Sequence, residues 1–573
     1  MPSRRRGARR GAECSELPVG LDVLRIIVSL VDDVRQLRLV CRAARGVVEE
    51  RLSACRAVAR KMGLWTKWRV PARALGRACL MRAPVPLAVQ YAKLDGALAA
   101  TTPLVELGVA CTLALRCSPA ELAEAATRAV AFAAGRAGAY ALSYERCTTR
   151  DVESIEIPAI VASVGRGAFT NRRALLGVTF AETSALAAIA EGAFESCARL
   201  RCVALPKRVQ TIEKLAFRRC RVLRDVTFEE GSVLTTIGEA AFHGCRAVED
   251  VTLPRTLQTI GVEAFLDCHL LRTMTFGEPS ALTAIGARAF TNCGALQSIA
   301  LPANVKVLES HAFCACSSLE RVTLPASLTE ICEGAFEWCS KLQHVVLPAS
   351  LKKIGVHAFA HCGALQRVKF SSSLETIGSD AFLKCEMLEC VRLPSSLLAI
   401  GERAFMGCSK LDCVRFATPN RLTVISTDAF SSCTALTSVA IPATVRVIHA
   451  HAFAMCTRLL SLYLDTDGAL ASIETRAFSG CAALRTVTFP PSLTSICMSA
   501  FCACRSLCDV TFAEPSSLEA IEGYAFEKCD ALEAVTLPVS LRSYATSAFG
   551  PRVAVWGLSS SFRVHFPNVI VLE

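Results

Sequence analysis

The chain has 573 residues, of which 52% are hydrophobic and 20% charged, with 30 cysteines and a formal net charge of +12. This apolar composition excludes a disordered chain, and the cysteines are too sparse for a small secreted domain held together by disulfides. Residues 1–150 carry a net charge of +13 and residues 151–573 a net charge of −1, so no extended nucleic-acid-binding surface is expected.

Residues 1–16 are expected to form a basic flexible tail. Five arginines fall between Arg4 and Arg10. Such a cluster is typical either of a nuclear-import signal or of a solvated tail, and both interpretations stay open.

The apolar stretch after this tail does not resemble a secretory signal, because Asp22 and Arg25 interrupt it. Residues 97–115 are the most membrane-like segment, but they contain Glu106, and a buried helix is expected there rather than a membrane span. These features predict an intracellular protein, cytoplasmic or nuclear, with reduced thiols.

Residues 17–60 are predicted to form a small helical module with apolar residues at helical spacing. The segment opens with Leu17-Pro18 and ends its pattern with Leu-x-Leu-Val-Cys-Arg at residues 37–42, which resembles an F-box. The resemblance implies docking on the adaptor of a cullin–RING ubiquitin ligase. The residues it assigns to docking or to the module's core are Pro18, Leu21, Ile27, Leu30, Leu39 and Val40. The alternative is an ordinary helical cap over the first repeat.

Residues 61–150 are rich in alanine, with apolar residues at helical spacing between 120 and 140. We expect a helical segment here that caps the repeats, so that the whole N-terminal module is helical.

From residue 151 to residue 557 the chain is a repeat in which the dipeptide Ala-Phe recurs every 23 or 25 residues. The phenylalanines are at positions 169, 194, 217, 242, 265, 290, 313, 336, 359, 382, 405, 430, 453, 478, 501, 526 and 549. A cysteine follows three residues later in every unit except the first and the last, which carry Arg172 and Arg552. Atypical end units are expected of a solenoid, because its ends face water.

Each unit predicts one strand and one tight turn. In the unit of Phe336, Val345 and Leu347 lie on one side of an extended segment, which Pro348 ends. The Ala-Phe-x-x-Cys segment is predicted to form one tight helical turn with Phe336 and Cys339 on the same face. Stacked units share a continuous core. The fold class is therefore α/β, a solenoid of about 17 repeats, followed by a C-terminal cap over residues 558–573.

The repeat resembles the BspA-like leucine-rich repeats, whose pattern includes Leu-Pro-x-x-Leu, Ile-Gly and Ala-Phe-x-x-Cys-x-x-Leu. The resemblance implies a right-handed solenoid with one short parallel strand per turn. It also implies a role in binding or adhesion rather than one particular activity.

The repeated cysteines fit either a metal or redox array or a buried packing column. Their strict repeat period favours buried, reduced thiols that pack the turn. The sequence contains no His-Glu-x-x-His, Walker loop or Gly-x-Ser-x-Gly motif. No catalytic residues, metal site or cofactor are therefore predicted, and we expect a protein that is not an enzyme.

A candidate binding surface follows from the residues on either side of the central valine of each strand. These residues point away from the core, and the resemblance places them on the concave face. In five adjacent units they include Arg321, His344, Arg367, Lys369, Arg392 and Arg415. This stripe, about 20 Å long, either binds an acidic surface of a partner protein or is a solvated face neutralised by Glu320, Glu389 and Asp412.

Two hypotheses for function remain. The first is a non-enzymatic protein-binding leucine-rich-repeat protein, in its sharper form an F-box-type substrate receptor of a ubiquitin ligase. The alternative is a structural or adhesin-like repeat protein with no role in ubiquitin ligation.

Overall fold

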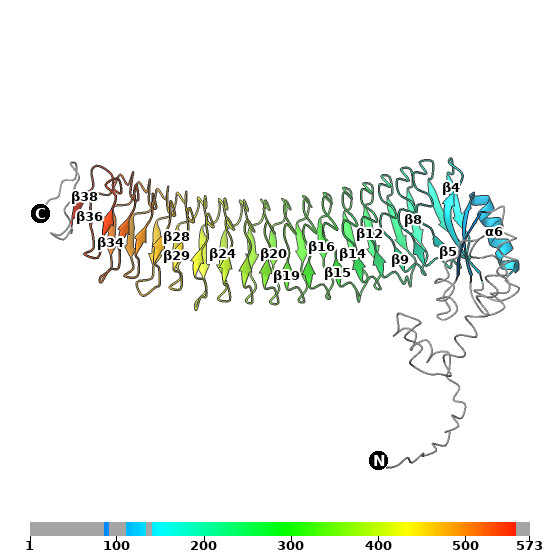
Figure 1. The fold of residues 1–573 in the computed structure, drawn as a ribbon, viewed down its shortest axis with the longest axis horizontal. Helices are drawn as coiled ribbons and strands as arrows, with labels where there is room; N and C mark the ends of the chain where they lie inside the picture. Colours follow the sequence, from blue (N-terminus) through cyan, green and yellow to red (C-terminus); the bar gives the residue numbers. More distant parts are fainter. Residues whose placement is uncertain (1–84, 91–110, 133–139, 557–573) are drawn as a thin grey trace, which may run out of the picture. The chain divides into compact units, whose positions relative to one another are not determined.

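The computed structural model describes residues 85–90, 111–132 and 140–556 (Figure 1). The chain divides into two compact units: the first comprises residues 1–148 and 158–162, and the second residues 149–157 and 163–573. The tail at 1–16, the F-box-like module at 17–60 and the C-terminal cap at 558–573 are predictions that lie outside the described residues.

The first unit contains three parallel strands and one helix in its described part. These are β1 (Val85–Gln90), β2 (Cys111–Cys117), α6 (Pro119–Phe132) and β3 (Tyr140–Cys147), with β2 pairing with both β1 and β3. Ser118 and Glu121 start the helix by reciprocal bonds: the Ser118 amide donates to Glu121 Oε2 (2.6 Å), and the Glu121 amide donates to Ser118 Oγ (3.3 Å). This capping box satisfies two amides that the first turn leaves without helical partners.

The expected all-helical N-terminal module is therefore wrong for this part of the chain, although α6 confirms a helix near residues 120–140. Alanine content favours a helix, but the decisive pattern in β2 is period two: Leu115 and Cys117 are buried and Arg116 between them is exposed. Alternating burial and parallel pairing outweigh local helix propensity.

The second unit is a solenoid of about 18 turns, and each complete turn contributes one strand to a main side and one to a second side (Figure 1). Main-side strands form parallel sheets of four, twelve and two strands. They are β4 (Ser154–Ile157), β6 (Gly177–Phe180), β8 (Cys202–Leu205), β10 (Asp225–Phe228), β12 (Asp250–Leu253), β14 (Thr273–Phe276), β16 (Ser298–Ala300), β18 (Arg321–Thr323), β20 (His344–Val346), β22 (Arg367–Lys369), β24 (Cys390–Leu393), β26 (Cys413–Phe416), β28 (Ser438–Ile441), β30 (Ser461–Leu464), β32 (Thr486–Phe489), β34 (Asp509–Phe512), β36 (Ala534–Thr536) and β38 (Ala554–Trp556).

The second-side strands are mostly two residues long and also pair in parallel. They are β5 (Val161–Val164), of which only the last two residues are counted in the second unit, β7 (Ala188–Ile189), β9 (Thr211–Ile212), β11 (Thr236–Ile237), β13 (Thr259–Ile260), β15 (Ala284–Ile285), β17 (Val307–Leu308), β19 (Glu330–Ile331), β21 (Lys353–Ile354), β23 (Thr376–Ile377), β25 (Ala399–Ile400), β27 (Val424–Ile425), β29 (Val447–Ile448), β31 (Ser472–Ile473), β33 (Ser495–Ile496), β35 (Ala520–Ile521) and β37 (Ser543–Tyr544). A glycine after such a strand lets turns approach closely: a Cβ on Gly378 would lie 2.6 Å from the carbonyl carbon of Gly355.

The predicted strand is confirmed in the unit of Phe336. Val345 is buried between the exposed His344 and Val346, Leu347 is buried, and Pro348 follows directly. The same alternation recurs along the main side, so each strand has one face in the core and one face in water.

The core contains a continuous column of stacked phenylalanine rings, one per unit from Phe169 to Phe549. Ring centroids of neighbouring units are 5.0 Å apart at the first pair and 5.6 Å apart between Phe313 and Phe336. The rings are nearly parallel, with the largest tilt, 14°, between Phe336 and Phe359. The shared core predicted from the repeat is therefore confirmed.

The Ala-Phe-x-x-Cys segment is not the predicted helical turn. Gly334 and Trp338, two residues before and after Phe336, have φ values of 58° and 61°, which a right-handed helix excludes. The Phe336 amide donates to the Ala358 carbonyl of the next turn, 2.8 Å away. The amides of Glu337 and Cys339 donate within the segment, to the carbonyls of Gly334 and Phe336 at 3.0 and 3.2 Å, so bonds to the next turn alternate with bonds of single turns and no helical ladder forms. Phe336 and Cys339 do share the buried face, as expected.

No helix among the residues with a described structure is long and apolar enough to cross a membrane.

Candidate functional site

The six residues of the predicted stripe lie on five consecutive main-side strands, β18 to β26, and their side chains are exposed. We call this set the basic ladder: Arg321, His344, Arg367, Lys369, Arg392 and Arg415. All five strands belong to the twelve-stranded parallel sheet. The solenoid therefore brings together six residues that are spread over 95 positions of the sequence.

The register of the sheet arranges the ladder in two adjacent lines. In the first line Arg321 pairs with His344, and His344 pairs with Arg367. In the second line Arg392 pairs with Arg415. Lys369 also belongs to the second line. Arg367 pairs with Cys390, and Lys369 and Arg392 each lie two residues after these two paired residues. Neighbouring parallel strands are about 4.8 Å apart, so side chains of like charge lie side by side.

Acidic neighbours neutralise little of this charge. Arg367 Nε lies 3.8 Å from Glu389 Oε2, and the two side chains are 77% and 52% exposed, so solvent screens the pair. No described residue forms an ion pair with Arg321, Lys369 or Arg392. Of the three carboxylates expected to compensate the ladder, only Glu389 is paired with it.

The rest of the main side carries mostly neutral outward residues. Thr275 donates to Thr252 and Thr511 donates to Thr488, each across 2.9 Å between hydroxyl oxygens. Tyr463 in the second line is exposed, and Val346, within the ladder, is 61% exposed. The basic ladder is thus a local feature that includes apolar surface.

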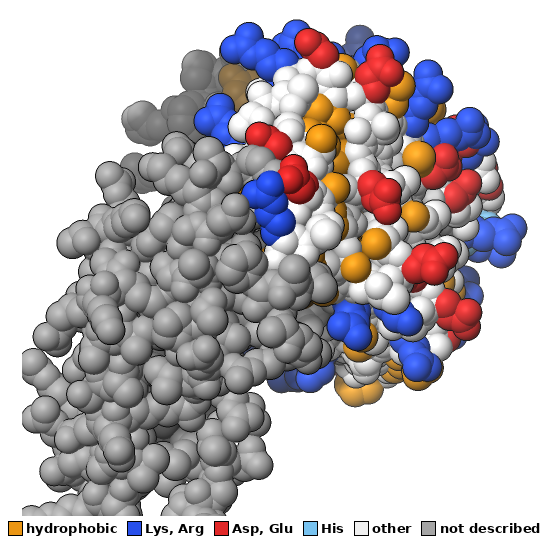
Figure 2. Space-filling view, turned by 90° about the vertical axis from the view of Figure 1, so that its right-hand side faces the viewer, with side chains coloured by type: hydrophobic (Ala, Val, Ile, Leu, Met, Phe, Trp, Pro, Cys, Tyr) orange, Lys and Arg blue, Asp and Glu red, His pale blue; other side chains and the backbone are white. Residues whose placement is uncertain are grey.

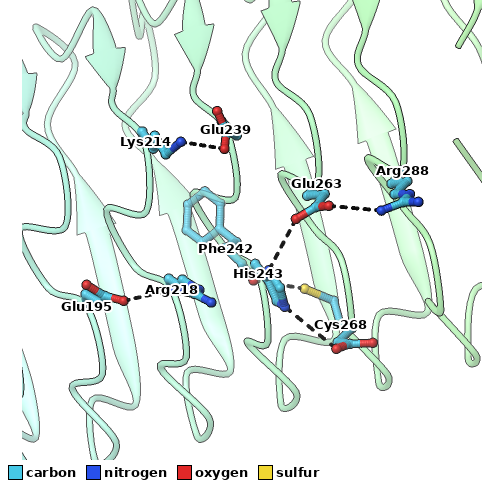
Figure 3. Close-up of polar contacts among 10 residues, drawn as sticks. Glu195, Lys214, Arg218, Glu239, Phe242, His243, Glu263, Cys268 and Arg288 are labelled. Carbon is cyan, nitrogen blue, oxygen red and sulfur yellow. Dashed lines mark hydrogen bonds and ion pairs between the residues drawn. The ribbon is translucent and has the colours of Figure 1, made fainter. Parts of the chain in front are cut away.

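The turn side of the solenoid shows the opposite arrangement, because basic and acidic side chains of neighbouring turns pair there (Figure 3). The ion pairs in this view are Glu195–Arg218 at 3.3 Å, Lys214–Glu239 at 2.6 Å and Glu263–Arg288 at 3.6 Å. His243 also lies 3.8 Å from Glu263 and 3.7 Å from Asp267, and it forms ion pairs with them only when it is protonated. Seen from one end, Lys and Arg are also interspersed with Asp and Glu (Figure 2). A run of unpaired side chains of one charge, as in the basic ladder, is therefore the exception on the surfaces in these two views.

The fifteen repeat cysteines are buried and none is in a disulfide, which confirms the packing interpretation. Sequence reasoning missed their hydrogen bonds: each Sγ donates to the phenylalanine carbonyl of the preceding turn, as Cys362 does to Phe336 across 3.1 Å. Burial raises the pKa of Cys408 and Cys456 to about 12. Within the described ranges there is no group of three or more side chains that could hold a metal ion.

Two other pairs near the ladder were given no role by sequence reasoning. Cys390 and Cys413, one residue from the central valine of β24 and β26, face outward and are half-buried. Trp338 stacks on His361 with ring centroids 3.9 Å apart, on the turn side. The two members of each pair occupy the same position in successive repeats, so the sequence could have predicted that they lie on neighbouring turns.

Three of the solved structures that are similar to this chain are bacterial leucine-rich repeat proteins. A leucine-rich repeat protein from Bacteroides ovatus is 26% identical, with a TM-score of 0.52, and the match covers 65% of this chain and 87% of that one. A leucine rich cell surface protein from Faecalibacterium prausnitzii is 23% identical, with a TM-score of 0.33 and coverage of 65% and 90%. The T. pallidum leucine rich repeat protein is 29% identical, with a TM-score of 0.27 and coverage of 35% and 87%. No curated protein matches the chain.

The protein-family model described as "BspA type Leucine rich repeat region" matches residues 142–272, 235–362, 329–460 and 461–552 of this chain. These matches run without a gap over more than half of the chain. The repeat units that they cover are those of the stacked phenylalanines and of the basic ladder. This protein therefore belongs to the family of BspA-type leucine-rich repeat proteins.

Proposed function

We propose that this protein is a non-enzymatic binding protein that recognises an acidic surface of a partner protein with the basic ladder. The observation that carries the proposal is the run of basic side chains on five adjacent strands with a single, exposed ion pair. Like charges side by side on a sheet are destabilising, and an acidic partner removes that penalty. Family membership supports the coarser statement, a repeat protein with a binding or adhesin-like role.

Charge reversal in the ladder tests the proposal on the full chain. We expect Arg367→Glu combined with Arg392→Glu to weaken binding of a fluorescent oligoglutamate peptide at least tenfold, measured by anisotropy. A tenfold loss corresponds to about 1.4 kcal/mol. Wild-type affinity should fall as salt rises, because the charges are exposed.

The matched control is Arg166→Glu combined with Arg542→Glu, which changes the net charge equally. These side chains are 75% and 76% exposed and lie outside the ladder. The control should bind the peptide like the wild type. Equal affinity in the ladder variant and the wild type, or equal losses in the two variants, would contradict the proposal.

The sharper form of this function is an intracellular F-box-type receptor that recruits a ubiquitin ligase through residues 17–60. It depends on the sequence motif alone, and the repeat itself supports the structural or adhesin-like alternative more directly. Co-purification with a cullin–RING adaptor that is lost in the Leu39→Asp, Val40→Asp variant would support the ligase role. Absence of the adaptor from the wild-type preparation would leave the alternative.

A further inference from the structure

Cys390 and Cys413 form an exceptional pair within the basic ladder. They are in register on β24 and β26, in the same line as Arg367. Of the 25 cysteines whose side chains the structure describes, only one other pair is in register in paired strands, Cys117 and Cys147, and both of these are buried. Cys390 and Cys413 are half-buried and face outward, so small solutes reach them.

The distance between the strands suits a disulfide. Paired parallel strands are about 4.7–4.9 Å apart, within the range of about 4.4–6.8 Å that disulfides span between Cα atoms. The two side chains leave the same face of the sheet at matching positions. The two thiols also interact. The pKa of Cys390 is raised, chiefly by burial and next by a side-chain hydrogen bond with Cys413.

Positive charge surrounds the pair. Arg415 Nε donates a hydrogen bond to Cys413 Sγ across 3.2 Å, so a guanidinium lies where the charge of an attacking thiolate develops. Arg367 is the strand neighbour of Cys390, and Arg392 lies two residues beyond it. This surrounding charge attracts an anionic oxidant.

The same two turns contain a second pair of cysteines in a contrasting environment. Cys385 and Cys408 are fully buried and donate to the carbonyls of Phe359 and Phe382, across 3.2 and 3.3 Å. Burial raises the pKa of both thiols. These cysteines are inert packing residues, although they repeat at the same interval as the outward pair.

We propose that Cys390 and Cys413 are a reversible modification site that is oxidised to an intramolecular disulfide by an acidic low-molecular-weight disulfide. The Cys413 thiolate attacks one sulfur of the oxidant, forms a mixed disulfide and expels one thiolate. The Cys390 thiolate then attacks the Cys413 sulfur and expels the second. Two protein thiols lose two electrons, and the oxidant becomes two thiols that take up the two protons.

The resulting bond is easily reduced. It would lie on the outward face of the sheet, where solvent reaches it. Exposed disulfides have more oxidising potentials than structural ones, so an excess of the reduced thiol restores the dithiol. This site does not depend on partner binding by the ladder.

Mass spectrometry of the full chain tests the site with oxidised glutathione as the probe. After alkylation of free thiols and trypsin digestion, we expect the peptide 385–392 joined to the peptide 411–415, with fragment ions that place the bond at Cys390 rather than Cys385. Excess reduced glutathione should remove this product. The exposed Cys202, which has no cysteine partner, should carry glutathione instead.

The variant Cys413→Ser provides the matched control. It should lose the joined peptide completely and carry one glutathione on Cys390. Two results would overturn the proposal: wild-type protein with glutathione on both cysteines at once, or wild-type protein with neither oxidised while Cys202 is modified. A joined product of the peptides 385–392 and 404–410 through Cys385 and Cys408 would also overturn it, because the buried pair would then be the reactive one.

Discussion

Truncation of one ring in the middle of the phenylalanine column tests the account of stability. Phe336 is fully buried, and its ring centroid lies 5.6 Å from that of Phe313 and 5.3 Å from that of Phe359. Phe336→Ala should lower the free energy of unfolding by about 3–5 kcal/mol, which is typical of buried phenylalanines. About 0.5–1.5 kcal/mol of this loss comes from each aromatic contact beyond simple burial.

The end of the column provides the comparison. Phe549 is 9% exposed and stacks on one ring of the column, that of Phe526, at 5.2 Å. Phe549→Ala should therefore lower the free energy of unfolding less than Phe336→Ala, by at least about 1 kcal/mol. Val346→Ala is the surface control, because this side chain lies in the same unit as Phe336 but is exposed; its effect should stay within about 0.5 kcal/mol.

Guanidinium unfolding followed by circular dichroism measures the loss, and hydrogen exchange locates it. A solenoid transmits a defect mainly to neighbouring units, so amide exchange should accelerate first in the units of Phe313, Phe336 and Phe359. Equal losses for Phe336→Ala and Phe549→Ala would refute the additive stacking argument. So would unchanged exchange in the three central units.

Three further predictions concern single side chains. Asp380→Asn should lower the free energy of unfolding by about 1–3 kcal/mol in guanidinium melts, because its buried carboxylate accepts two bonds from Arg403, at 2.9 and 2.8 Å. Burial holds the pKa of His243 below its usual value, so stability should fall as pH drops below about 6.5, where the unfolded chain binds a proton that the folded chain does not; His243→Gln should lessen this fall in thermal melts. Iodoacetamide should label the exposed Cys202 and Cys508 within the native protein while the fifteen core thiols stay unlabelled.

Each of these predictions has its own control. Arg403→Gln should cost more than Asp380→Asn, because it leaves the buried Asp380 carboxylate without its two donors, whereas Asp380→Asn releases a half-exposed arginine that water can solvate; the reverse order would contradict the argument. An unchanged pH dependence in His243→Gln would assign the effect to other groups, such as His361, whose pKa is also lowered, chiefly by burial. Rapid native-state labelling of Cys362 would contradict its burial.

Much of the fold could be predicted because the same pattern recurs in unit after unit. Val345, Leu347 and Pro348 predicted a strand and its end, and the structure places them there. The Ala-Phe-x-x-Cys segment was assigned a helical turn, because spacing in a single unit does not distinguish hydrogen bonds within a turn from those between turns. In the first unit, the alanine content suggested helices. The structure has the strands β1, β2 and β3 there instead, because each is stabilised by pairing with a strand that is distant in the sequence.

The sequence by itself determined the repeat, the strand of each unit, the buried faces and the positions of the ladder residues, because each is a periodic property of one chain. Only the tertiary structure decided which charges are paired and which thiols face one another. Arg367 meets Glu389 and Cys390 stands beside Cys413 through the register between neighbouring turns, and this register follows from packing the phenylalanine column and closing the hydrogen bonds between turns.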